Sequence, residues 1–166
     1  GVDVFDAAEI PQYQYQRTPN VITSLEFERM INAGGPTNGH LIRPSDHEVP
    51  KTVSFIQCIG WRSNKTNPYC SNVCCMNTIK DALLIKEHWP DTEIKVFYID
   101  IRAFGKGFED LFQRAKKLGV QFIRGLPGDV LPLKNGNLRL IGEMTLMDKL
   151  YDIETEMVIL SVGLKP

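Results

Sequence analysis

The fold class is decided by the stretch Thr52-Val53-Ser54-Phe55-Ile56-Gln57, an apolar and β-branched run of the length of one buried strand. Residues 71–89 carry apolar side chains at helical spacing, and a second strand pattern follows at 94–99. A helix pattern over 108–118 precedes a third strand pattern at 120–124. This alternation of strands and helices predicts a parallel sheet in a Rossmann-like α/β domain.

Downstream of these elements the strict alternation ends. The pair Asn135-Gly136 lies between the apolar runs 130–133 and 138–141, which is typical of a tight hairpin or a meander. A last strand is expected over 157–163. The sequence therefore predicts a three-layer Rossmann-like domain with a parallel sheet and a small antiparallel hairpin or meander. Such a domain is similar to the NAD(P)-type domain of flavoprotein disulfide reductases.

Upstream, residues 1–22 are rich in Gln, Tyr and Pro and show no sustained period, so at most a short strand is expected there. Thr23 and Glu26 fit a capping box, which predicts a short helix over 24–33. We expect a lead-in segment with one short helix over 1–48 and a Rossmann-like cysteine-cluster domain over 49–166. A start without Met and an end directly after an apolar strand indicate an excised fragment.

The composition excludes several classes of protein. Lys and Arg number 19 against 20 Asp and Glu, so the net charge of −1 supplies no basic excess for nucleic-acid binding. No apolar run approaches the roughly 20 residues that span a bilayer, and the N-terminus lacks the pattern of a signal peptide. We therefore expect a cytoplasmic protein with no nucleic-acid partner and no membrane span.

The four cysteines form one constellation, C-x11-C-x3-C-C, made of Cys58, Cys70, Cys74 and Cys75. Cys58 follows the first strand of the alternation, Cys70 directly precedes the expected helix, and the adjacent pair occupies its first turn. The end of a strand and the start of the following helix converge in a Rossmann unit. The sequence therefore predicts that the four thiols meet in space.

Three interpretations of the cysteines remain open from the residues alone. A structural zinc ion takes its ligands in a tight tetrahedron, whereas the side chains of neighbouring helical residues such as Cys74 and Cys75 diverge by roughly 100°. That divergence suits two corners of an iron–sulfur cluster better, and the helix N-terminus stabilises thiolates and an anionic cluster. Free or redox-active thiols are the third interpretation, with Cys70 pairing Cys74 or Cys58 in a disulfide.

Dinucleotide binding is a further possibility at the same turn. In Rossmann domains this turn carries G-x-G-x-x-G, whose glycines let the backbone approach a pyrophosphate. Here only Gly60 could serve, so a dinucleotide is not expected at this position. Asp100 could contact a ribose, but a surface ion pair with Arg102 is the simpler interpretation.

Several other residues have a simple structural interpretation. The three histidines are expected to be exposed, and a solvated rim of cations is expected at the strand ends. Trp61 and Tyr69 bracket the loop between Cys58 and Cys70 and could either shield a cluster from water or simply pack within the loop. The three histidines are His40, His47 and His88, and the cations of the expected rim are Arg102, Lys106 and Arg124.

Residues 55–60, 69–76 and 100–109, which read FIQCIG, YCSNVCCM and DIRAFGKGFE, closely resemble the A subunit of heterodisulfide reductase. The resemblance extends to residues 19–30 and 161–166, so it covers nearly the whole chain. It implies a large FAD and iron–sulfur protein with a thioredoxin-reductase-like body. The cysteines that match Cys58, Cys70, Cys74 and Cys75 hold a [4Fe–4S] cluster in that family. Quinone-interacting relatives share part of the pattern.

The resemblance identifies the chain with the second nucleotide-type domain, because the flavin fingerprint and the ferredoxin-type cysteine motifs have no counterpart here. It implies an electron-transfer domain of an oxidoreductase. The implied partners are the FAD-binding and ferredoxin-like domains of the parent chain and other heterodisulfide reductase subunits, so the isolated chain is expected to be inactive. The alternative is an NAD(P)-binding-type module of a pyridine nucleotide-disulfide oxidoreductase with structural or zinc-bound cysteines.

Overall fold

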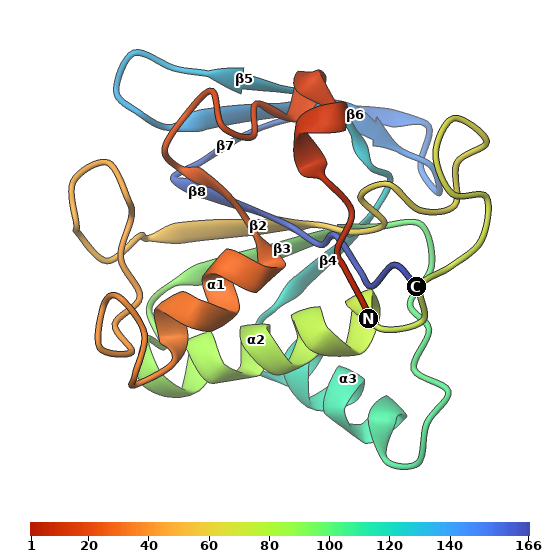
Figure 1. Ribbon diagram of the computed structural model, residues 1–166, viewed down its shortest axis with the longest axis horizontal. Helices are drawn as coiled ribbons and strands as arrows, with labels where there is room; N and C mark the ends of the chain where they lie inside the picture. The colour runs from red at the N-terminus through yellow and green to blue at the C-terminus, as the bar shows by residue number, and fades with distance from the viewer.

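The computed structural model describes all residues from Gly1 to Pro166, and its centre is a five-stranded sheet in the order β1-β8-β2-β3-β4 (Figure 1). Every neighbouring pair in this sheet is parallel. The strands are β1 Val21–Thr23, β2 Thr52–Ile56, β3 Glu93–Tyr98, β4 Gln121–Arg124 and β8 Met157–Leu160. The parallel sheet predicted from the alternating pattern is confirmed.

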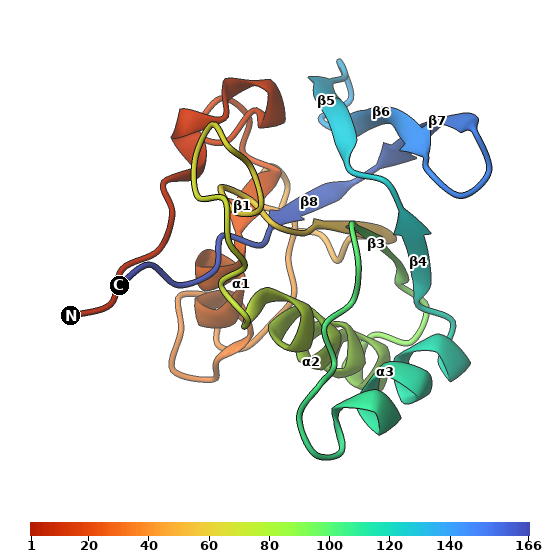
Figure 2. The ribbon, with the colours of Figure 1, turned by 90° about the vertical axis from the view of Figure 1, so that its right-hand side faces the viewer.

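Three helices follow β1, β2 and β3 in turn, and all of them cover the same face of the sheet (Figure 2). They are α1 Ser24–Ile31, α2 Cys74–His88 and α3 Phe108–Lys117. The predicted capping box is present at α1, where Glu26 N–H donates to Thr23 Oγ1 over 3.3 Å and Thr23 N–H donates to Glu26 Oε2 over 2.7 Å. None of the helices is long and apolar enough to cross a bilayer.

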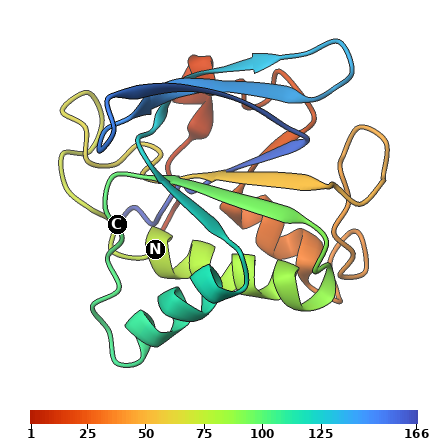
Figure 3. The same ribbon diagram turned by 180° about the vertical axis from the view of Figure 1, so that it is seen from behind.

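A three-stranded antiparallel meander covers the opposite face, as the views from the side and from behind show (Figures 2 and 3). It consists of β5 Pro127–Pro132, β6 Leu138–Met144 and β7 Lys149–Thr155. The molecule is therefore a three-layer α/β domain, with helices, parallel sheet and meander in that order. This confirms the predicted fold class.

Two hydrophobic cores lie on the two faces of the parallel sheet, and the strands divide their side chains between them. On β8, Met157 and Ile159 join the core under the helices, whereas Val158 and Leu160 join the core under the meander. This follows from the period of two along a strand. Because both faces are covered, β8 reads as a continuous apolar run instead of an alternating one.

Several element boundaries differ from the sequence-based expectation. The helix expected from residue 71 begins at Cys74, because Asn72 has a left-handed backbone with φ of 63° and cannot continue a right-handed helix. The helix expected to end at residue 33 ends at Ile31, since Asn32 is extended. The last strand ends at Leu160 instead of residue 163.

The first 23 residues pack onto the domain. Phe5, Ala7 and Tyr13 are buried in the core under the meander, and β1 pairs with β8 along its whole length. Two short 3-10 helices, η1 Ala7–Glu9 and η2 Pro11–Tyr13, precede β1. The two ends of the chain lie side by side (Figure 1), where Asp3 and Lys165 exchange two backbone hydrogen bonds of 2.9 and 2.7 Å.

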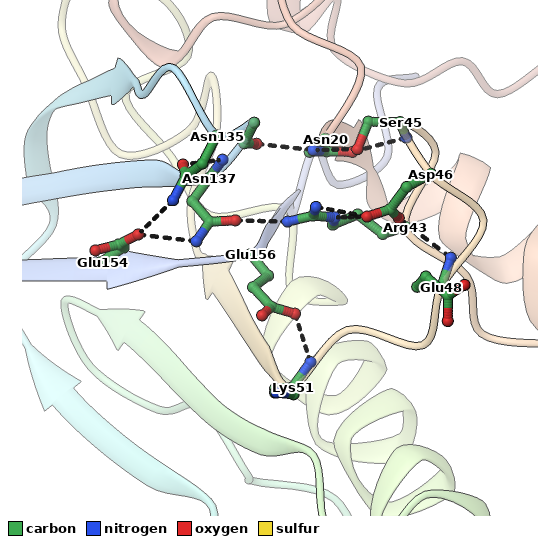
Figure 4. Close-up of polar contacts among 11 residues, drawn as sticks. Asn20, Arg43, Ser45, Asp46, Glu48, Lys51, Asn135, Asn137, Glu154 and Glu156 are labelled. Carbon is green, nitrogen blue, oxygen red and sulfur yellow. Dashed lines mark hydrogen bonds and ion pairs between the residues drawn. The ribbon is translucent and has the colours of Figure 1, made fainter.

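A polar network joins the segment before β2 to the β5–β6 hairpin (Figure 4). The Asn20 side chain is fully buried; its amide donates to Ser45 Oγ over 2.9 Å and to the Gly136 carbonyl over 2.8 Å, and its oxygen accepts from Ser45 N–H. Arg43 donates to Asn137 over 2.5 Å, and Asn137 in turn donates to Glu154. These contacts bridge segments that are about a hundred residues apart in the sequence.

Substituting Asn20→Ala is expected to destabilise the fold by about 1–3 kcal/mol, because it removes three part-buried hydrogen bonds made by a fully buried side chain. Urea unfolding measures the loss. Asn135→Ala is the matched control, since Asn135 belongs to the same network but lies at its exposed edge. An equal loss of unfolding free energy in both variants would show that the burial of Asn20 does not determine the effect.

Candidate functional site

All four cysteines line one small pocket at the carboxyl ends of the parallel strands, together with Trp61 and Arg102. We call this the thiol pocket. Cys58 lies two residues beyond β2, Cys70 lies in the loop before α2, and Cys74 and Cys75 form the first turn of α2. The structure therefore brings together the four residues that the sequence singled out. Their role as metal ligands remains a prediction.

Three of the four thiols have a defined polar neighbour. Cys74 Sγ lies 3.1 Å from Ser71 Oγ and donates to the Ser161 carbonyl over 3.8 Å. Cys75 Sγ donates to the Asp100 carbonyl over 3.7 Å, and Asn72 N–H donates to Cys70 Sγ over 3.3 Å. Because Ser161 follows β8 and Asp100 follows β3, the pocket draws on the ends of several strands.

Burial controls the protonation of these thiols. It raises the pKa of Cys58 to about 12 and the pKa of Cys74 to about 11, and it also raises the pKa of Cys75. The mutual repulsion of the thiolates adds to these shifts, whereas Arg62 opposes the pKa shift at Cys58 and Ser71 opposes it at Cys74. Without a metal centre these three thiols are protonated at neutral pH, so metal binding displaces protons.

The loop between β2 and α2 has an unusual backbone. Cys58, Arg62 and Asn72 all have left-handed conformations, with φ of 59°, 58° and 63°. Such conformations cost free energy in residues other than glycine and persist where the surrounding structure imposes them. Trp61 is one such constraint, because it is 2% exposed and its indole N–H donates to the Val162 carbonyl over 2.6 Å.

Trp61 closes the thiol pocket on one side. Tyr69 packs against it edge to face, with ring centroids 5.4 Å apart, but is itself 53% exposed. A Cβ on Gly163 would lie 2.5 Å from Ser71 Oγ and 2.6 Å from Trp61 Nε1, so glycine at this position lets both side chains approach the chain end. Trp61 is therefore buried at the thiol pocket, which fits both ordinary loop packing and the predicted shielding, and the shielding remains a prediction.

The amino end of α2 points its free amides toward the same place. Val73 is the N-cap residue and provides no side-chain hydrogen bond to them. The first four N–H groups of a helix have no partner within the helix, and together they carry a partial positive charge. This end of α2 therefore favours thiolates and negatively charged groups over neutral ones.

A cluster of three charges borders the thiol pocket. Arg62 Nη1 lies 2.5 Å from Asp100 Oδ1, and Arg102 Nε lies 3.5 Å from the same oxygen. The ion pair expected between Asp100 and Arg102 is present, but Arg62 makes the closer contact across 38 positions of sequence. No local pattern in the sequence signals this second arginine.

The arrangement of the sulfur atoms bears on the kind of metal centre. Nowhere in the chain do three cysteine, histidine or carboxylate side chains surround one point closely enough to hold a single metal ion. A zinc site needs four ligands within about 2.3 Å of one ion. A set of four cysteines is a donor set that both iron–sulfur clusters and structural zinc ions use.

The turn after β2 is not shaped for a dinucleotide. Gly60 has φ of 78°, and a Cβ there would lie 2.1 Å from the ring of Phe5. This glycine is therefore required by the packing of the N-terminal segment against the turn. Asp100, the candidate for a ribose contact, is held by two arginines.

A larger cleft lies on the other side of Cys74, between α1, α2 and the end of β8. Cys74 lines both the cleft and the thiol pocket. Lys80 forms an ion pair with Glu28 in this cleft.

The remaining candidates, apart from Arg102, lie outside the thiol pocket. The three histidines are exposed, as expected. The cations of the expected rim are also exposed, and they do not form one site. Arg102 borders the thiol pocket, whereas Arg124 donates to the Ile99 carbonyl and lines a separate surface pocket.

Comparison with known proteins places this chain in a family. The chain is 51% identical over its whole length to the A subunit of the H(2):CoB-CoM heterodisulfide,ferredoxin reductase of Methanothermobacter thermautotrophicus. It is 49% identical, again over its whole length, to the iron-sulfur A subunit of the CoB–CoM heterodisulfide reductase of Methanocaldococcus jannaschii. The chain is a homologue of part of the heterodisulfide reductase A subunit. It spans about a quarter, 26%, of the length of each relative, and no protein-family model matches it.

Solved structures agree on the fold of this heterodisulfide reductase segment. The FAD-bound cadaverine monooxygenase DfoA of Erwinia amylovora aligns with a TM-score of 0.56 and 9% identity, over all of this chain and 44% of its own. The thioredoxin reductase of T. acidophilum aligns with a TM-score of 0.52 and 11% identity, over all of this chain and 43% of its own. The predicted kinship with flavoprotein disulfide reductases is confirmed at the level of fold, and the relatives of the chain are oxidoreductases.

Proposed function

We propose that this chain is an electron-transfer domain of a heterodisulfide reductase, within its A subunit. In this proposal Cys58, Cys70, Cys74 and Cys75 hold a [4Fe–4S] cluster that relays electrons to or from FAD bound elsewhere in the parent protein. The observation that carries the proposal is the convergence of all four thiols on one pocket at the amino end of α2. A cluster held there would supply one-electron storage.

The residues around the thiols have matching roles in this proposal. Trp61 excludes water from one side, which favours a stable cluster environment. The amino end of α2 stabilises the thiolate ligands that a cluster requires. Because no residue in the thiol pocket is arranged as an acid–base pair, the pocket suits electron transfer better than bond making.

The cleft next to Cys74 gives a flavin a route to the thiol pocket. A flavin in a neighbouring part of the parent protein could approach Cys74 through this cleft without displacing Trp61. The chain itself lacks a glycine-rich pyrophosphate turn, and Gly60 is occupied by its contact with Phe5. We therefore assign FAD to another part of the parent protein, with the FAD-binding and ferredoxin-like domains and other subunits as partners, and we expect the chain alone to be inactive.

The competing function is an NAD(P)-binding-type module with structural or zinc-bound cysteines, and it rests on the similarity of fold to thioredoxin reductase. The two functions predict different metal contents. After anaerobic purification and reconstitution we expect the chain to contain iron and acid-labile sulfide in equal amounts and to be brown. A colourless protein that holds one zinc ion after the same treatment would support the competing function.

A further inference from the structure

We propose that the three charges Arg62, Asp100 and Arg102 set the reduction potential of the centre held in the thiol pocket. This inference rests on the proposed function and adds residues that are not ligands. We refer to them as the charge triad. Their net charge is positive, because two guanidinium groups share one carboxylate.

The geometry places the triad at the wall of the pocket. Arg102 lines the pocket directly, and the backbone carbonyl of Asp100 accepts from Cys75 Sγ over 3.7 Å. Arg62 lies in the same loop as Cys58, four positions further on, and its guanidinium is 2.5 Å from Asp100. The triad therefore adjoins the thiol pocket on the side of Cys58 and Cys75.

The position of Arg62 is fixed by the backbone as well as by the ion pair. Its N–H donates to the Tyr69 carbonyl over 3.1 Å, and its left-handed φ of 58° directs the chain around the buried Trp61. Its side chain is 23% exposed, so water screens this charge less than the charges on the open surface. Because its position is fixed in this way, the positive charge of Arg62 stays beside the thiol pocket.

The sign of the effect follows from charge balance. Reduction adds one electron to the cluster and makes it one unit more negative, with no bond formed or broken and no proton required; under the proposed function a reduced flavin of the parent protein can supply this electron. A fixed positive charge stabilises the more negative state and raises the potential, and a fixed negative charge lowers it. Arg62 and Arg102 therefore raise the potential, and Asp100 lowers it.

A merely structural ion cluster makes a different prediction. It would change the stability of the loop in all three variants in the same direction and would leave the potential unchanged. The charge triad instead predicts shifts of opposite sign from neighbours that contact one another. This difference separates the two roles without any measurement of activity.

The experiment is a reductive titration of the reconstituted chain with dithionite, followed by electron paramagnetic resonance and the visible spectrum. We expect Arg62→Gln and Arg102→Gln each to lower the equilibrium constant for one-electron reduction about tenfold, which is about 59 mV. Asp100→Asn is expected to raise this equilibrium constant. The reduction potential of the double variant R62Q/D100N is expected to lie between those of the two single variants. Arg139→Gln is the matched control, because Arg139 forms a similar ion pair with Asp152 on the exposed face of the meander.

The outcomes are distinguishable. Shifts of opposite sign in R62Q and D100N, with no shift in the control, support the inference. Loaded variants that all keep the wild-type potential, or that all shift in the same direction, overturn it and leave the proposed function intact. If R62Q fails to load, D100N and R102Q still decide the sign. Wild-type protein that takes up no iron and sulfide overturns the proposed function and this inference together.

Discussion

Replacing Cys75 by serine is expected to reduce the bound iron and sulfide at least tenfold. Cys75 is buried, opens α2 beside Cys74, and donates to the Asp100 carbonyl. Serine keeps the size of the side chain but offers a hydroxyl, which is not the soft thiolate that iron–sulfur clusters require. Loss of a residue that only hydrogen-bonds to a metal ligand already lowers metal affinity 10- to 100-fold, so loss of a ligand itself should have at least this effect.

The measurement is iron and sulfide content with the visible spectrum after anaerobic reconstitution. Met76→Leu is the matched control, because Met76 is the next residue of the same helix turn, is half-buried, and tolerates a change of similar volume. Circular dichroism of both variants tests whether the helix remains folded. Full cluster occupancy with an unchanged spectrum in C75S would show that Cys75 is not a ligand.

The parallel sheet, its helices and the antiparallel meander could be derived from the sequence because the signals for them are local. The strands β2, β3 and β4 and the helices between them have their own periodicity and caps, and Asn135-Gly136 marks the meander. The sequence of β7 also carries a strand signal, although no strand is expected there in the sequence-based prediction. Its buried or half-buried residues Tyr151, Ile153 and Thr155 alternate with charged ones, as in a strand with one exposed face.

The details of the site were less accessible, because they depend on contacts between distant segments. The cysteine spacing predicted convergence, and the four thiols do share a pocket. The partner of Asp100 was expected two positions away, whereas Arg62 is brought to it by a loop whose path depends on left-handed residues. Asparagine tolerates a left-handed backbone, so Asn72 carries a weak signal for the start of α2. Arg62 carries no such signal, so the charge triad required the structure.

The stability of the chain is expected to fall as the pH rises from about 4 to about 8, because of one carboxyl group, Asp81 on α2. The side chain is fully buried; Oδ2 accepts from Asn77, and Lys80 Nζ lies 3.3 Å from Oδ1 without hydrogen-bond geometry. Burial, then the neighbouring Glu28, raises the pKa of Asp81 to about 8, while Lys80 opposes the shift. The folded protein therefore retains a proton that the unfolded chain releases at about pH 4.

The sign follows from proton linkage. Between pH 4 and 8 the folded state binds more protons than the unfolded state, so rising pH favours unfolding until Asp81 ionises in the fold. Four units of pKa set an upper limit of about 5 kcal/mol for this loss. Asp81→Asn removes the titrating group and keeps its shape, so the variant should lose less stability over this range and be more stable than the wild type at pH 8.

Urea unfolding at pH 5, 6, 7 and 8 under reducing conditions measures both effects. The matched control is Asp152→Asn, whose wild-type carboxylate is exposed and whose pKa is lowered by Arg139. Asp152 contributes stability that is fully present above its unfolded pKa of about 4, so between pH 5 and 8 its replacement should change the stability by a constant amount and leave the slope of the profile unchanged. Wild-type and D81N profiles that run parallel would mean that Asp81 is ionised in the folded protein, with Lys80 outweighing the burial of the carboxylate.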